Sequence, residues 1–412
     1  MRRLGGYLYA LPERSPVLLG NLLVLLVAPL GILLSTFWAT GPHPHGSGIG
    51  GKFLNMDGSI YQNIALTGYR SQLVGSAQDH NIAFFPLYPL ITHSLSLLLG
   101  NSGPWVFILP GLVFGLCSND LFYRLAEQIL PEASAAWATL FFALWPACCF
   151  IFMGYATGLA NLCALLSLTH YISGRKLRAA VWCGVGTAAA PAMVFFAAGL
   201  CGDAGYEWLS DKRPLVRVPR LILFGLLSVS GLIGFMIYQL IKFHNPIAFI
   251  IMQQAWAQQP ENFSQHLMNF FNINWYFVVF VFVQHAVNGI QHRNFLVTAD
   301  GRNSIDIAFQ YMLGWLVFWA SLAAIAIAAH RFPQKPLVWT GACIWLGYLW
   351  FNVTGVGYFF NALRLVYPVV VVFLLLGSWS IKHRIFRYAL LGLSMVLAVL
   401  EMSLVLAGYD VL

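Results

Sequence analysis

Long apolar stretches separated by short polar turns run through almost the whole chain. The first extends from about 17 to 39, after a basic flank. Others follow near 84–99, 104–123, 135–172, 179–201, 219–241, 271–290, 305–329, 337–351, 363–380 and 387–408. Because a helix needs about 20 apolar residues to cross a bilayer, the pattern predicts an all-α polytopic membrane protein with about ten to twelve membrane segments. No polar stretch is long enough to fold a soluble domain.

Two of these stretches are interrupted by proline. Stretch 135–172 is long enough for two crossings, and Pro146 breaks it within "WPACCFIFMGYATG". Stretch 179–201 breaks at Pro191. Broken helices at membrane depth are tolerated where they line a cavity inside the protein. We therefore expect both breaks to border such a cavity.

Basic residues concentrate at the ends of the apolar stretches, where they indicate topology. Clusters lie at 2–14, 175–178, 212–220, 331–335 and 382–387. Cytoplasmic loops carry an excess of Lys and Arg, so we expect these clusters and the N-terminus in the cytoplasm. The chain then forms one transmembrane domain, 1–412, with a long first extracytoplasmic loop, 40–103. Segment 271–290 must be re-entrant or paired with another short piece.

The first extracytoplasmic loop divides into three parts. Residues 40–53 are rich in Gly, Pro and His and predict a flexible loop. Residues 57–68 predict a short helix, and Asp57 is a candidate N-cap because Asp is preferred there. Residues 84–99 begin with two prolines and suit a helix lying in the membrane interface as well as one crossing it.

Composition agrees with a membrane protein. The 412 residues are 59% hydrophobic and only 9% charged, whereas a soluble domain carries about 25% charged residues. The net charge of +8 is spread over the ends of the apolar stretches and does not form a nucleic-acid-binding patch. The seven cysteines lie within apolar stretches without zinc-ligand spacing, which predicts buried thiols. An isolated His43–His45 pair belongs to the Gly/Pro-rich loop.

Three charged residues are isolated along the chain. Asp57 is the only acidic residue between Glu13 and Asp79, and Lys242 and Arg364 each lie far from other charges. An isolated ionisable residue at the edge of a membrane span is a candidate functional residue. The alternatives are helix capping for Asp57 and, for the two cations, a side chain that reaches out to the lipid headgroups.

Together these residues suit a lipid-linked phosphate substrate. A cation would hold the phosphate, and a carboxylate would take the proton of an attacking hydroxyl. Candidate substrate contacts are Tyr61, Tyr69, His80, Asn81, Phe84, Phe85, Tyr88 and Trp256. The aromatic members offer faces for a sugar ring, although aromatic residues also line membrane interfaces generally.

The segment "DGSIYQNIALTGY…HNIAFFPLYPLI" resembles the first luminal loop of the mannosyltransferases that add the second mannose to GPI anchors, and of their bacterial relatives. "FHNPIAFIIMQQAW" (243–256) and "ALRLVYP" (362–368) are similar to two later elements of that family. The matches occur in the family's order and span most of the chain.

The resemblance implies a GT-C glycosyltransferase fold with its site on the extracytoplasmic face. The donor would be a polyprenyl-phosphate-linked sugar, mannose or another hexose, and the acceptor a lipid, glycan or protein. Asp57 matches the catalytic general base of an inverting transfer, and Arg364 matches a basic position near the donor phosphate, to which we add Lys242. No metal is implied, since Arg and Lys can hold a monophosphate. The membrane would be a bacterial inner membrane or the endoplasmic reticulum.

The chain departs from this family at three positions. Met56 replaces a Trp before the Asp, "YATG" at 155–158 replaces a "YSES"-like sequence, and Ala190 lies where an Arg is common. Because of these departures, a GT-C-like scaffold or partner subunit without activity remains an alternative interpretation. A lipid transporter is a further alternative, but transporters usually show paired repeats, which the sequence lacks.

Cysteine labelling tests the predicted topology. In a Ser47→Cys variant, a membrane-impermeant maleimide should react from the extracytoplasmic side, because residues 40–103 are predicted to lie there. Labelling from the cytoplasmic side only would overturn the topology and the side assigned to the site.

Overall fold

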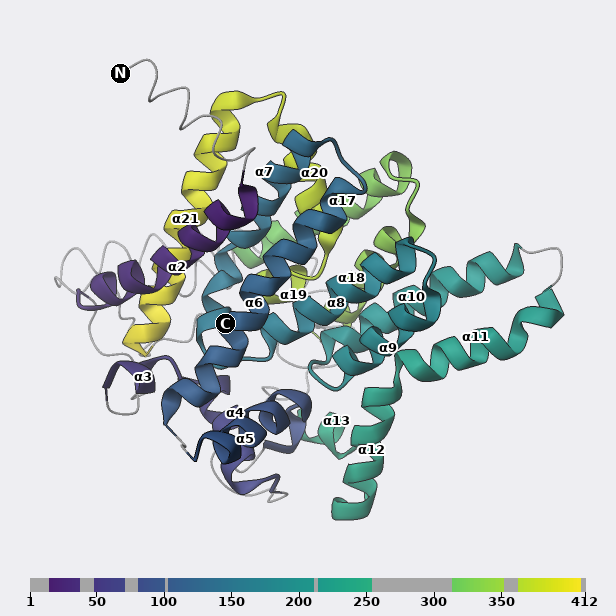
Figure 1. The fold of residues 1–412 in the computed structure, drawn as a ribbon, viewed down its shortest axis with the longest axis horizontal. Helices are drawn as coiled ribbons and strands as arrows, with labels where there is room; N and C mark the ends of the chain where they lie inside the picture. The colour runs from purple at the N-terminus through teal and green to yellow at the C-terminus, as the bar shows by residue number, and fades with distance from the viewer. Residues whose placement is uncertain are drawn as a thin grey trace, which may run out of the picture.

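The computed structural model describes residues 15–37, 48–70, 81–100, 103–210, 214–253, 313–351 and 362–408. Within these ranges all regular elements are helical (Figure 1). They are α2 (Pro16–Ser35), α3 (Gly48–Lys52), α4 (Asp57–Thr67), α5 (Leu87–Leu99), α6 (Pro104–Glu127), α7 (Glu132–Ala143), η2 (Pro146–Phe152), α8 (Thr157–Ile172), α9 (Lys176–Thr187), α10 (Ala192–Leu209), α11 (Pro214–Ser228), α12 (Ser230–Phe243), α13 (Ala248–Gln253), α17 (Gly314–Arg331), α18 (Lys335–Phe351), α19 (Ala362–Val366), α20 (Val370–Ser380) and α21 (Arg384–Ala407).

Several of these helices are long and apolar enough to cross a membrane. In the described ranges these are α2, α6, α17 and α21, and there are up to six spans if the two bent pairs, α7 with η2 and α11 with α12, each count as one. The chain is therefore an integral membrane protein. The predicted total of about ten to twelve segments stays a prediction, and stretch 271–290 lies outside the described residues.

Both predicted proline breaks are present. α7 ends at Ala143, and the 3-10 helix η2 starts at Pro146 with its axis turned by 62°. α9 ends at Thr187, and α10 starts after Pro191. Proline lacks the N–H that a continuing helix needs and clashes with the preceding turn.

The first loop is more ordered than the sequence indicated. α3 occupies residues 48–52, so the prediction of an irregular loop over 40–53 is wrong at its end. α4 confirms the short helix over 57–68. α5 has 13 residues and is about 20 Å long at 1.5 Å per residue, too short for a hydrocarbon core of about 30 Å. This length favours an interfacial helix.

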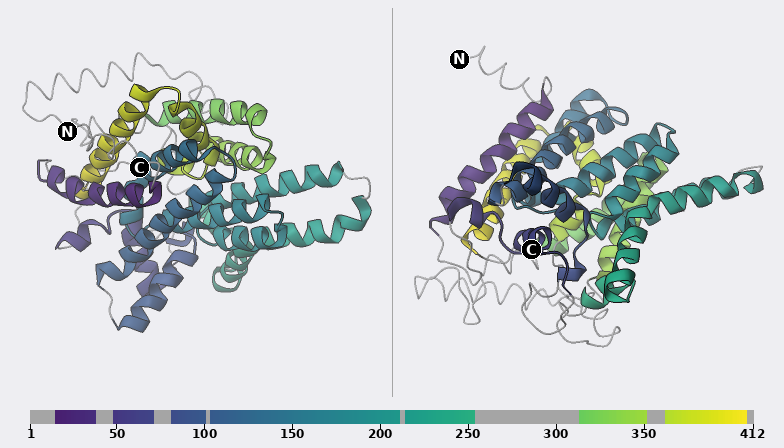
Figure 2. Two further views of the ribbon diagram at one scale, coloured as in Figure 1. Left: turned by 45° about the horizontal axis from the view of Figure 1, so that its top comes forward. Right: turned by 60° about the horizontal axis from the view of Figure 1, so that its bottom comes forward.

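The core surrounds η2, whose side chains are all buried. α2, α6, α19 and α21 all pack against it. Figure 1 shows α4 and α5 together beside one end of α6, and Figure 2 shows α2 and α21 lying side by side. The first loop also reaches the second break, because Leu87 N–H donates to Ala188 O at 2.9 Å. Because η2 starts at Pro146 and is buried beneath other helices, the Pro146 break lies in the core of the protein.

The seven cysteines are all free thiols. Cys148, Cys149, Cys163 and Cys183 are buried, as predicted. Cys117 is exposed on α6, so the prediction of a buried thiol is wrong there. The periodic pattern of a membrane helix does not separate its lipid-facing side from its core side, because both are apolar.

Candidate functional site

The candidate base and a candidate phosphate-binding cation form an ion pair. Arg364 Nη1 donates to Asp57 Oδ2 at 2.9 Å, across 307 positions of sequence. The Arg364 side chain is 23% exposed and the Asp57 side chain 19%. The pair therefore lies in a partly open site where a ligand can reach it and where its charges are only weakly screened.

Asp57 opens α4 and does not cap it. The N-cap position belongs to Met56, and no side chain caps the helix, so the capping interpretation of Asp57 is wrong. The carboxylate lies at the positive end of the helix dipole, which favours its charge. Met56 has φ +50° and ψ −123°, a conformation that costs a non-glycine residue about 1–3 kcal/mol. The chain thus holds a strained turn directly before Asp57.

Hydrogen bonds from distant segments support this turn. The Tyr155 hydroxyl accepts the Asp57 backbone N–H at 3.2 Å. Asn55 Nδ2 donates to Val405 O of α21 at 3.3 Å, and Asn55 Oδ1 accepts the Met56 N–H at 2.9 Å. The start of α4 is therefore anchored to both the η2–α8 turn and α21.

The Arg364 guanidinium lies against two aromatic rings, which are stacked on each other. Its guanidinium carbon lies 5.4 Å from the Phe150 ring centre and 5.3 Å from that of Tyr155. The Trp145 indole N–H donates to Leu363 O at 2.7 Å and fixes α19 on the η2 segment. A cation over an aromatic face gains about 0.5–2 kcal/mol. The guanidinium is thus oriented by residues other than Asp57.

Tyr61 lies one helical turn after Asp57, between two aromatic rings. Its ring centre is 5.3 Å from that of Phe84 and 5.5 Å from that of Tyr88. Burial raises the pKa of Tyr61, and the nearby Asp57 carboxylate raises it further, while Arg364 opposes them. The hydroxyl therefore stays neutral and can act as a hydrogen-bond donor beside the ion pair.

Glu401 of α21 is a second acid near the site that the sequence interpretation missed. It is 1% exposed, and among the described residues its Oε2 atom has no hydrogen-bond partner. The carboxyl lies against the Cys149 thiol and close enough to Arg364 for their charges to interact. It is the only acidic residue in stretch 387–408, and an acid inside a membrane span is a candidate functional residue by default.

Lys242 lies at the other end of α4. A Cβ atom added to Gly68, directly after the helix, would be 3.9 Å from Lys242 Nζ. Asp57 and Gly68 are about 16 Å apart along a helix rising 1.5 Å per residue. The ammonium instead lies near the rings of Tyr238 and Phe243. The two predicted phosphate-binding cations are thus too far apart to hold one phosphate group together.

The remaining candidate contacts have packing roles. Tyr69 donates to Phe84 O at 2.8 Å, and Tyr88 donates to Phe107 O at 2.6 Å. Asn81 is buried and bonds the backbone of Gly68 and Arg70. Phe85 is 1% exposed. A sugar contact by any of them stays a prediction. His80 and Trp256 lie outside the described residues.

The 155–158 turn contributes a tyrosine to the site but no carboxylate. Thr157 begins α8, and Ala190 lies in the turn before α10. Among the described residues, no group of three or more His, Cys, Asp or Glu side chains could hold a metal ion.

Two glycines allow the start of α4 to approach the η2–α8 turn. A Cβ atom on Gly58 would be 2.4 Å from Met153 O. Gly154 has φ +66°, and its Cβ would be 2.8 Å from Leu54 Cδ2. Side chains at these positions would push Asp57 away from Tyr155 and Arg364.

No protein-family model matches the sequence, and no curated protein matches it significantly. Among solved structures, it is similar to the Archaeoglobus fulgidus oligosaccharyltransferase in complex with zinc and sulfate, with 13% identity and a TM-score of 0.47 over 94% of this chain and 53% of that one. It is also similar to oligosaccharyltransferase AglB from the same organism, in complex with an inhibitory peptide and a dolichol-phosphate, with 13% identity and a TM-score of 0.43 over 97% and 56% of the two chains. The chain spans about half the length of these proteins.

Gly58→Ala tests the close approach at the site. The added methyl group should clash with Met153 O and destabilise the protein by about 1–3 kcal/mol, the usual cost of overpacking, measured by thermal unfolding in detergent. Gly225→Ala is the control, because a Cβ atom there meets open space and Ala favours a helix. Equal unfolding temperatures for the two variants would contradict the predicted contact.

Proposed function

We propose that this protein is a membrane glycosyltransferase of the GT-C type. It transfers a hexose, mannose being the first candidate, from a polyprenyl-phosphate donor to an acceptor at the extracytoplasmic face. The observation that carries the proposal is the Asp57–Arg364 ion pair. It joins the two residues that the resemblance to the GPI-anchor mannosyltransferases assigns to base and phosphate contact.

The pair supplies the two groups that an inverting transfer requires. The acceptor oxygen attacks the anomeric carbon, and its proton passes to the Asp57 carboxylate. The bond between the anomeric carbon and the phosphate oxygen breaks, and the lipid phosphate leaves with that electron pair. Arg364 stabilises the charge on the departing phosphate, as a guanidinium does through paired N–H donors. Asp57 therefore acts as general base and Arg364 as donor-phosphate contact.

Donor binding then changes the state of Asp57. In the structure, Arg364 Nη1 contacts Asp57 Oδ2. A donor phosphate brings anionic oxygens that compete for the same guanidinium. Once Arg364 turns to the phosphate, the Asp57 oxygen is free to accept a proton from the acceptor. Donor binding would thereby precede activation of the acceptor hydroxyl.

Lys242 has no part in the donor-phosphate contact of this proposal. Its ammonium lies near Gly68, at the opposite end of α4 from Asp57. A role for Lys242 would require a second anionic group of a substrate or headgroup. Arg364 alone is assigned to the donor phosphate.

A GT-C-like scaffold or partner subunit without activity is the second candidate. It is favoured by the 155–158 turn, which places Tyr155 at the site but brings no acid, and by Ala190, which brings no cation. A scaffold needs neither a free carboxylate nor a donor-binding guanidinium. The two candidates therefore differ in what replacement of Asp57 does.

Asp57→Asn tests the general base. Asn retains an oxygen that can accept from Arg364, so thermal stability should stay close to wild type. Transfer from polyprenyl-phosphate sugars, measured by mass spectrometry of the product, should fall by about 10²–10⁴-fold, the usual contribution of a positioned acid or base. Asp120→Asn is the control, because Asp120 makes an exposed pair with Arg124 on α6. A folded Asp57→Asn protein with full turnover would refute the base role.

Arg364→Ala tests the phosphate contact. Removing the charge-assisted hydrogen bond should weaken binding of polyprenyl-phosphate mannose by about 10- to 100-fold, corresponding to about 1.5–3 kcal/mol. Binding of acceptor should change much less. Arg124→Ala removes the cation of the exposed α6 pair and should leave donor binding unchanged. Equal losses for donor and acceptor would count against a phosphate contact.

A further inference from the structure

Glu401 of α21 is a buried acid that the proposed reaction does not use. Its side chain is enclosed by other helices, and its Oε2 atom has no hydrogen-bond partner among the residues that the structure describes. A buried oxygen without a partner destabilises a folded protein, because its contacts with water are lost and not replaced. The groups around Glu401 show which donor this oxygen can gain when the site binds a ligand.

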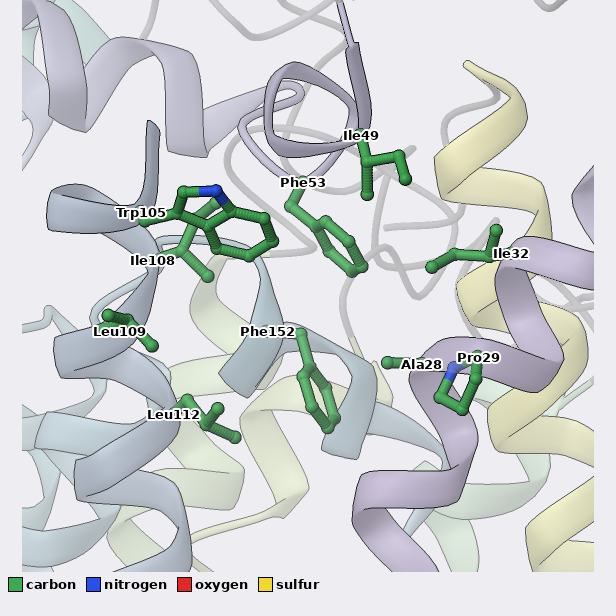
Figure 3. A pocket seen from close by; sticks show the side chains of 10 residues that line it. All are labelled: Ala28, Pro29, Ile32, Ile49, Phe53, Trp105, Ile108, Leu109, Leu112 and Phe152. Atoms are coloured by element: carbon green, nitrogen blue, oxygen red, sulfur yellow. The ribbon is translucent and has the colours of Figure 1, made fainter. Parts of the chain in front are cut away.

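The helices around Glu401 carry no cation. α21 packs mainly against α2, α7, η2 and α20, whose sequences contain no Lys, Arg or His. On α21 itself the nearest basic residue is Arg387, about 21 Å away along a helix that rises 1.5 Å per residue. The pocket between α2 and α6, at the end of η2, is lined by uncharged side chains and includes no residue of α21 (Figure 3). A cationic donor for Glu401 must therefore come from another segment.

Arg364 of α19 is the cation nearest to this acid. The Glu401 carboxyl lies against the Cys149 thiol, and the Arg364 guanidinium lies over the ring of Phe150, the next residue of η2. Arg364 and Glu401 are close enough to interact electrostatically. A guanidinium has five N–H donors, and within the described part of the chain Arg364 donates only from Nη1 to Asp57 Oδ2. Unused donors therefore lie near an unused acceptor.

The same side of α21 also contacts the turn that carries the other partner of the ion pair. Val405 O accepts the Asn55 amide, and Asn55 lies just before the strained turn at the start of α4. Residues four apart lie on one side of a helix, so Glu401 and Val405 face the site together. α21 therefore contacts the segment that carries Asp57 and the surroundings of Arg364 with a single face.

We propose that Glu401 is a positioning residue for the donor phosphate. When the phosphate draws the Arg364 guanidinium away from Asp57, a further guanidinium N–H donates to Glu401 Oε2, and the remaining N–H groups hold the phosphate. Hydrogen bonds from an ionised donor are about twice as strong as neutral ones, and a bond at one edge of the planar guanidinium fixes the direction of the others. The inference rests on the function proposed above and adds the residue that orients Arg364 toward the phosphate.

Glu401→Met in the full chain tests this role, with binding of polyprenyl phosphate measured by native mass spectrometry. Methionine is unbranched and flexible but offers no acceptor oxygen, so Arg364 should lose its second contact. Binding should fall about 10-fold, near the lower end for a hydrogen bond to a charged group. Thermal unfolding in detergent should show a variant at least as stable as wild type, because the unpartnered buried oxygen is removed. A merely structural role for Glu401 would not weaken binding in a stable variant.

Asp203→Leu is the matched control. Asp203 of α10 is likewise a buried acid with an oxygen that has no partner in the described ranges, but it lies near Tyr171 instead of Arg364, so binding should stay at the wild-type level. Glu401→Gln keeps an acceptor oxygen and should lose only about 3-fold, a loss that tests the role if the methionine variant does not fold. In an Arg364→Ala background, Glu401→Met should weaken binding no further, because Glu401 acts through Arg364.

Two results would overturn the inference and leave the proposed function in place. One is wild-type binding by the Glu401 variants, and the other is a loss of the same size with and without Arg364. Absence of polyprenyl-phosphate binding by the wild-type chain would overturn both the inference and the proposed function. The behaviour of the wild-type protein therefore distinguishes the two failures.

Discussion

The structure of the site depends on one largely buried ion pair, Asp57 with Arg364. Its side chains are 23% and 19% exposed, so the two charges attract each other through a medium less polar than water. Each partner is also fixed independently, Asp57 through the Tyr155 hydroxyl and Arg364 through its aromatic neighbours and the Trp145 bond to α19. Each side chain is therefore held in place by residues other than its partner. A ligand can replace one partner of the ion pair with little rearrangement of the backbone.

The parts of the fold that depend on local chemistry could be predicted from the sequence. The apolar spans follow from hydrophobicity, and the breaks at Pro146 and Pro191 follow from proline geometry. Isolation along the sequence identified three charged residues, Asp57, Lys242 and Arg364. It does not predict which of them contact one another in the fold. Only Asp57 and Arg364 meet, because that outcome depends on how α4, η2 and α19 pack. Lys242 has the same sequence signature and lies at the opposite end of α4.

Sequence patterns could not predict two other features of the site, the role of the first-loop aromatic residues and the presence of Glu401. Aromatic residues of the first loop, such as Phe85 and Tyr88, were assigned to substrate by composition, yet the structure buries them. In a chain with 15% aromatic residues, a ring that packs and a ring that binds have the same local sequence. Glu401 was missed because a single acid does not interrupt the pattern of a strongly apolar stretch. Its significance is visible only where α21 passes Cys149 and Arg364.

The long sequence separation within the ion pair has a consequence for biosynthesis. Asp57 and Arg364 are 307 positions apart, and ribosomes add about 5–20 residues per second, so the carboxylate waits about 15–60 s for its partner. Val405, which accepts the Asn55 amide, is synthesised later still. Throughout this interval the first loop has left the ribosome without the groups that complete it. The site is thus assembled only after α19 and α21 have been synthesised, and premature termination before α19 would release a chain carrying an unpaired acid.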